Sequence, residues 1–128
     1  MMINVALFGL GRVGIMHAED ISLHSKFNLK YVFDTNQKLS MEAARKFKSK
    51  NITDPSKAFT DKDINLIFIA SSTSTHVPLI IKAAKYKKVI FCEKPIDLNI
   101  NKVIKCRKSI KKYKPKIQIG FNRRYDPG

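Results

Sequence analysis

The 128-residue sequence has the size of one domain, and 44% hydrophobic residues supply enough apolar material for a single core. No apolar run is long enough to span a bilayer, and residues 1–4 do not resemble the start of a signal peptide, so we expect a cytoplasmic protein without a membrane partner. The formal net charge of +15 would suit a nucleic-acid partner, but the charge is spread along the chain and argues against one dedicated surface.

Short apolar runs alternate with longer amphipathic segments along the chain. We predict strands at residues 3–8, 29–33, 51–53, 64–70, 88–92 and 116–120. Helices are predicted at 13–24, 38–49, 76–85 and 99–113, with a single helical turn at 55–59. This alternation predicts an α/β fold in which a mostly parallel sheet is doubly wound by helices, in one domain over residues 1–128.

A glycine-rich turn follows the first predicted strand directly. Residues 9–14 fit the GxGxxG spacing and run into the first helix. In dinucleotide-binding domains the first glycine permits a tight turn, the second lets the backbone approach a pyrophosphate, and the third allows close packing of helix on strand. The amides at the helix start then face the anion. A purely structural glycine turn is the alternative to a dinucleotide site formed by Gly9, Gly11, Arg12, Val13 and Gly14.

The second predicted strand ends in Asp34, twenty residues beyond Gly14. Dinucleotide-binding folds place an acidic residue there against the adenosine ribose. Its carboxylate can accept hydrogen bonds from both ribose hydroxyls and would repel a 2′-phosphate. Because no arginine occurs in residues 35–37, the sequence favours NAD over NADP, although Lys38 is close enough to bear on that preference. An aspartate in an ordinary strand-to-helix turn is the alternative.

The fourth predicted strand leads into the hydroxyl-rich run Ser71-Ser72-Thr73-Ser74-Thr75-His76. In an open parallel sheet this turn points toward the ligand crevice. Ser72 and Thr73 could bond the nicotinamide ribose, and His76 could lie beside the ribose or the pyrophosphate. Helix capping by the hydroxyls and packing of His76 at the helix start are the structural alternatives.

The fifth and sixth predicted strands are followed by two further motifs. Glu93-Lys94-Pro95 follows the fifth, and GFNRRYD (residues 120–126) begins at the end of the sixth. Taken in order with the glycine turn, the strand-end aspartate and the hydroxyl-rich turn, these motifs resemble those of the Gfo/Idh/MocA oxidoreductases. The last is similar to the GFxRRxD segment of the family's inositol 2-dehydrogenases. The resemblance covers nearly the whole chain and implies an amino-terminal, NAD-binding Rossmann domain.

The resemblance also implies roles for individual residues. Lys94 is expected to act as the catalytic residue that reaches the substrate hydroxyl and the nicotinamide ribose, Glu93 to help fix the loop, and Arg123 to lie near the nicotinamide and the polyol. A lysine beside the positive nicotinamide ring has its charged form disfavoured and can share a proton with a developing alkoxide. The implied reaction is hydride transfer between an inositol-like polyol or sugar and NAD.

The family holds its substrate mainly in a carboxy-terminal α+β domain, which we expect to be absent from these residues. We therefore expect dinucleotide binding with little or no turnover by this chain alone. An absent domain would also leave apolar surface exposed, which makes a homo-oligomer a further expectation. Cys92 and Cys106 form no CxxC pair and have no histidines at zinc-ligand spacing, so we expect reduced thiols and no metal.

Two alternatives to this function remain. One is a basic Rossmann-type binding module, a dinucleotide sensor or nucleic-acid-associated domain without catalysis. Its densest run of basic residues, Lys102 to Lys116, alternates with apolar residues at helical spacing, which is typical of a solvated helix face and argues against nucleic-acid binding. The other is a methyltransferase, which also uses a glycine loop and a strand-end acid but gives no role to Lys94 or Arg123.

Overall fold

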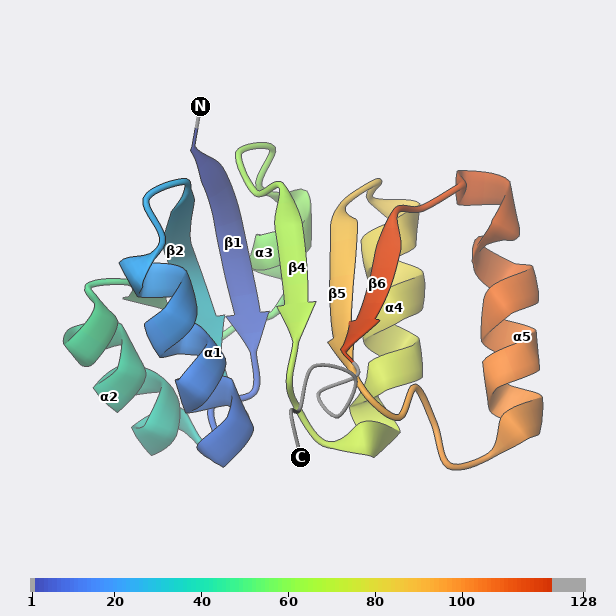
Figure 1. Cartoon of the computed structure of the whole chain (residues 1–128), viewed down its shortest axis with the longest axis horizontal. Coiled ribbons are helices and arrows are strands. Elements are labelled where there is room, and N and C mark those ends of the chain that lie inside the picture. Colours follow the sequence, from blue (N-terminus) through green and yellow to red (C-terminus); the bar gives the residue numbers. More distant parts are fainter. Residues whose placement is uncertain (1, 121–128) are drawn as a thin grey trace, which may run out of the picture.

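One sheet of six parallel strands forms the centre of the domain (Figure 1). The computed structural model describes residues 2–120 of the chain. Along the sheet the strands follow the order β3-β2-β1-β4-β5-β6, so the direction of winding reverses between β1 and β4. The strands are β1 (Ile3–Phe8), β2 (Phe27–Phe33), β3 (Lys50–Asn51), β4 (Leu66–Ile69), β5 (Val89–Glu93) and β6 (Ile117–Gly120).

Helices lie on both faces of the sheet, because β1 and β4 carry buried apolar side chains on both faces. In Figure 1, α1 and α2 lie in front, over β1 and β2, whereas α3 and α4 lie behind, and α5 packs beside α4. The helices are α1 (Arg12–Leu23), α2 (Gln37–Phe47), α3 (Ser56–Thr60), α4 (His76–Lys85) and α5 (Ile100–Ile110), with 3₁₀ turns at Thr73–Thr75 and Lys111–Tyr113. The doubly wound Rossmann fold predicted from the sequence is confirmed.

Element boundaries agree closely with the sequence pattern. The bounds predicted for β1 and α4 match those observed, whereas β2 begins two residues earlier than predicted, at Phe27, which packs against the front core. Asn99 caps α5 by accepting a hydrogen bond from the Asn101 amide at 2.9 Å. The α5 helix ends at Ile110 and its last turn tightens into a 3₁₀ helix, which accounts for the longer predicted span.

Surface features also follow the sequence pattern. On α5 the basic residues are exposed while Cys106 and Ile110 are buried, so the lysine-rich run forms a solvated helix face. On the face of the sheet that α1 and α2 cover elsewhere, no helix within residues 2–120 lies over β6, and a groove of about 600 Å³ lined by residues of β4, β5 and β6 runs there (Figure 1). Val89 and Ile117 are exposed there. None of the helices in the described part of the chain is both long and apolar enough to cross a membrane.

A polar network joins β2 to the connection between α3 and β4. Asp61 accepts hydrogen bonds from Lys30 Nζ at 2.7 Å and from the Tyr31 hydroxyl at 2.6 Å, and these donors hold the pKa of its carboxyl well below the ordinary value. Lys88 Nζ donates to the backbone carbonyls of Asp61 and Ile64, and burial lowers its pKa. The network therefore fixes this connection against the sheet.

Candidate functional site

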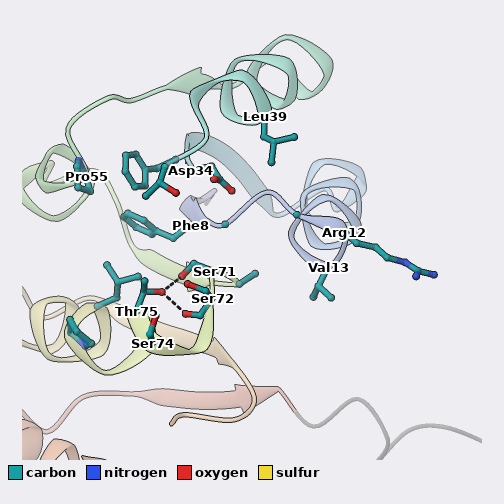
Figure 2. A pocket seen from close by; sticks show the side chains of 17 residues that line it. Phe8, Arg12, Val13, Asp34, Leu39, Pro55, Ser71, Ser72, Ser74 and Thr75 are labelled. Atoms are coloured by element: carbon teal, nitrogen blue, oxygen red, sulfur yellow. Dashed lines mark hydrogen bonds between the residues drawn. The ribbon is translucent and has the colours of Figure 1, made fainter. Parts of the chain in front are cut away.

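A cleft of about 720 Å³ opens at the carboxyl ends of the strands, where the winding of the sheet reverses between β1 and β4 (Figure 2). Open parallel sheets bind ligands at this position. Three segments provide most of the lining of the cleft: the glycine turn after β1, the residues after β2 and the hydroxyl-rich turn after β4, while Leu39, Pro55, Pro78 and Leu79 complete it. The sequence-predicted site residues among them are Gly9, Gly11, Arg12, Val13, Asp34 and Ser72.

The three glycines of the turn serve different purposes. Gly9 has a φ of +96°, and a side chain there would overlap the backbone of Ala70 and Ser71. A Cβ on Gly14 would overlap the Gly9 carbonyl, so this glycine lets α1 pack on the turn. Around Gly11, in contrast, a Cβ would meet no heavy atom within 4 Å. Packing within the described chain thus accounts for Gly9 and Gly14, whereas the space beside Gly11 is open to a ligand.

Asp34 lies at the end of β2 and faces the same cleft as the glycine turn. Its Oδ2 accepts a hydrogen bond from the Leu10 amide at 2.7 Å, and its Oδ1 accepts one from the Asn36 amide at 2.8 Å. The carboxylate therefore orients the glycine turn as well as its own loop. Each oxygen retains a further acceptor position, so ribose hydroxyls can still bind. Lys38 is not among the residues that line the cleft.

The turn after β4 presents hydroxyl groups to the cleft. Thr75 Oγ1 donates to the Ser72 carbonyl at 2.6 Å and lies 2.6 Å from Ser71 Oγ (Figure 2). These bonds stabilise the turn internally, and the helix capping by hydroxyls considered from the sequence is not observed at either helix start. Ser72 and Ser74 line the cleft, whereas Thr73 does not.

His76 lies at the start of α4 and is 1% exposed. Its Nδ1 is 2.7 Å from the Pro95 carbonyl oxygen, and its Nε2 is 2.8 Å from the Ser71 carbonyl oxygen. The imidazole thus joins the turn after β4 to the loop after β5, and it does not line the cleft. This placement agrees with the structural alternative given for His76, that of packing at the helix start.

Glu93 and Lys94 lie at the end of β5 in different environments. Glu93 is 8% exposed, and its Oε1 is 2.5 Å from Nε2 of His17 in α1, whereas Lys94 is exposed. The sequence reasoning missed His17. Its signal was its position one helical turn after Gly14, on the side of α1 that packs against the sheet. The predicted residue Arg123 lies outside the described residues.

The cysteine beside this loop is chemically inert. Cys92 is fully buried in β5, and burial, with the charge of Glu93 adding to it, raises its pKa to about 12. Burial likewise raises the pKa of the Cys106 thiol. Because the thiolate is the reactive form, neither cysteine supplies a nucleophile near neutral pH.

Comparison with known proteins gives a consistent result. The family model described as "Oxidoreductase family, NAD-binding Rossmann fold" matches residues 3–121. The chain is 35% identical over 124 residues to the myo-inositol 2-dehydrogenase of Thermotoga maritima, an alignment that covers 96% of this chain and 37% of the relative. The chain thus spans little more than a third of that relative's length.

Two solved structures are also similar. A myo-inositol dehydrogenase from Corynebacterium glutamicum superposes with a TM-score of 0.92 at 37% identity, covering 99% of this chain and 38% of that one. The scyllo-inositol dehydrogenase from Lactobacillus casei, solved with NAD(H) and scyllo-inositol, superposes with a TM-score of 0.90 at 28% identity, again covering 99% of this chain and 38% of that one.

Proposed function

Since the chain belongs to the Gfo/Idh/MocA oxidoreductase family, as an NAD-binding Rossmann domain, we propose that its cleft is the dinucleotide half of a polyol dehydrogenase active site. The whole enzyme would transfer a hydride between an inositol-like cyclic polyol or sugar and NAD, as the names of the similar proteins suggest. This chain alone would bind NAD with little or no turnover, because it spans little more than a third of its relatives.

The open space at Gly11 is the observation that carries the proposal. Gly9 and Gly14 are required by contacts within the protein, but no contact within the described chain requires a glycine at position 11. Gly11 precedes α1 directly, where free amides and the helix dipole favour an anion. A dinucleotide diphosphate at this place would use the room that a methyl group would take, with Arg12 and Val13 beside it.

The neighbouring segments fit the two halves of the dinucleotide. On the β2 side, Asp34 accepts hydrogen bonds from the adenosine ribose hydroxyls, and its charge repels a 2′-phosphate. The nicotinamide half lies on the side of β4 and β5, near the hydroxyl-rich turn, with Ser72 as its proposed ribose contact; Thr73, which does not line the cleft, is not assigned this role. His76 supports this turn through the Ser71 carbonyl oxygen, which lies 2.8 Å from its Nε2.

Lys94 is the residue we propose to act on the substrate. It follows β5 directly, at the same edge of the sheet as the cleft, and its side chain is exposed. Bound NAD supplies the hydride acceptor for the carbinol carbon. Lys94 Nζ hydrogen-bonds the substrate hydroxyl and shares a proton with the developing alkoxide, while Glu93 helps to fix the loop.

Isothermal titration with NAD and NADP separately tests the proposal on the 128-residue chain. We expect NAD to bind with a defined stoichiometry and NADP to bind more weakly. Asp34→Asn should reduce the discrimination between the two, whereas Asp20→Asn, which makes the same charge change on an exposed face of α1, should not. Failure of the unaltered chain to bind NAD would refute the proposal.

An activity assay tests the second part. With inositol and NAD, these 128 residues should produce little or no NADH above a blank, since they span little more than a third of the relative's length. Turnover comparable to that of a full-length relative would contradict this expectation.

The net charge of +15 favours one second candidate, a basic binding module without catalysis. Nucleic-acid binding of that kind falls steeply with added salt, because it releases counterions. Tight, salt-sensitive DNA or RNA binding in the absence of a thermal shift by NAD would support this candidate, whereas the reverse result would support the dehydrogenase.

A further inference from the structure

The carboxylate of Glu93 lies where three separate segments of the chain meet. It projects from the end of β5 toward α1, where His17 Nε2 lies 2.5 Å from its Oε1. At the end of β6, a Cβ on Gly120 would lie 3.2 Å from the same oxygen and 2.9 Å from the Phe91 ring. Gly120 therefore leaves the room that the carboxylate occupies.

The imidazole of His17 is itself held in place. Its ring packs on Phe68 and Phe91 with centroid distances of 4.6 and 5.8 Å, and these two rings stack on each other at 4.3 Å. An ionised carboxylate can only accept, so Nε2 carries the hydrogen and donates to Glu93. Because both side chains are largely shielded from water, this bond constrains geometry more than a surface pair would.

Pro95, the residue that follows Lys94, is held by a second histidine, His76. His76 lies at the start of α4 with its Nδ1 2.7 Å from the Pro95 carbonyl oxygen and its Nε2 2.8 Å from the Ser71 carbonyl oxygen. Lys94 is thus exposed between two neighbours that are each anchored, one to the helix that follows the glycine turn and one to the turn that lines the cleft.

We propose that His17 and His76 form a clamp that positions Lys94 against the nicotinamide half of the bound dinucleotide. His17 acts through the Glu93 side chain and His76 through the Pro95 carbonyl, so neither needs to touch the cofactor. The clamp links α1, at whose start the diphosphate is proposed to bind, with the loop that carries the proposed catalytic lysine. This inference rests on the proposed function of Lys94 and of the cleft.

Two ligands separate positioning from a general structural role. NAD reaches both the glycine turn and the loop after β5, whereas ADP carries only the adenosine and the diphosphate. Loosening the loop lowers the fraction of molecules in which Lys94 is in place, and the apparent affinity for NAD falls in proportion to that fraction. Titration calorimetry on the 128-residue chain should show His17→Ala and His76→Ala weakening NAD binding by about tenfold while leaving ADP binding within about twofold.

Conservative and control variants complete the test. His17→Gln keeps an N–H donor toward Glu93 and should recover most of the NAD affinity, and it carries the test if His17→Ala does not fold. His24→Ala removes an exposed histidine at the far end of α1 and should change neither affinity. Equal weakening of NAD and ADP, or an unchanged affinity for NAD, would overturn the clamp. Loss of NAD binding by the unaltered chain would instead refute the proposed function beneath it.

Discussion

Replacing Gly11 with alanine should separate ligand binding from folding. At φ −73° and ψ −164° the backbone of Gly11 is extended and suits alanine, and the added Cβ would meet no heavy atom within 4 Å. Alanine restricts the unfolded chain but is a poorer helix N-cap than glycine, so these effects oppose each other and the free energy of unfolding should change by less than about 1 kcal/mol.

Binding should respond differently. The new methyl group would stand between the helix-start amides and a diphosphate, removing one or two charge-assisted hydrogen bonds. At about 1.5–3 kcal/mol for each, the affinity for NAD should fall by at least about tenfold. Gly14→Ala is the matched variant, because its Cβ would overlap the Gly9 carbonyl. It should lower the free energy of unfolding by about 3 kcal/mol and the melting temperature by roughly 10 °C.

Thermal unfolding followed by circular dichroism and calorimetric titration with NAD measure the two quantities on the same samples. The reasoning predicts that Gly11→Ala melts like the unaltered chain and binds poorly, while Gly14→Ala melts early. If Gly11→Ala bound NAD with unchanged affinity, no diphosphate would occupy the space beside Gly11, and the proposed site would be wrong.

Three further predictions concern other parts of the domain. Asp34→Ala removes the acceptor of a glycine-turn amide as well as the proposed ribose contact, so calorimetry should show NAD affinity reduced by about tenfold or more, without NADP reaching the original NAD affinity. Asp61, whose folded-state pKa is depressed by its lysine and tyrosine donors, contributes stability that is present above about pH 4 and is lost as the pH falls below it. Asp61→Asn should therefore cost about 1 kcal/mol at pH 7 and flatten this acid dependence in urea titrations at several pH values; equal pH profiles would contradict the assignment. Cys92, buried with a pKa of about 12, should resist a thiol reagent at about pH 8 in the folded chain and react once urea unfolds it, and fast labelling of the native protein would count against the structure.

The sequence predicted those features that depend on neighbouring residues. Strand β1 and the glycine turn could be predicted from the sequence because their signals are local. The apolar run of the strand, the positive φ that Gly9 adopts and the start of the helix each depend on adjacent residues. The position of Asp34 followed from the same βαβ unit. The helix start at α5 followed from Asn99, whose side chain can cap only the residues that come directly after it.

Contacts between distant segments could not be predicted in this way. His17 and Glu93 are 76 residues apart, and only the packing of α1 across β4 and β5 brings them together. The hydroxyl-rich run indicated a turn, but the 3₁₀ geometry of residues 73–75 decides that Ser72 and Ser74 line the cleft while Thr73 does not. The interpretation of His76 stayed open in the sequence because its two carbonyl partners lie in separate loops.

The close approach of Gly14 to the Gly9 carbonyl also has a kinetic consequence. Since the backbone of the helix lies directly against the backbone of the turn at Gly14, the turn takes its shape when the chain folds and does not wait for a ligand. Ordering a flexible loop costs about 1–2 kcal/mol per residue, and that cost is already met before any dinucleotide arrives. Association and dissociation of the dinucleotide should then need no rearrangement of the turn, and their rates should be set by diffusion and by the contacts in the cleft.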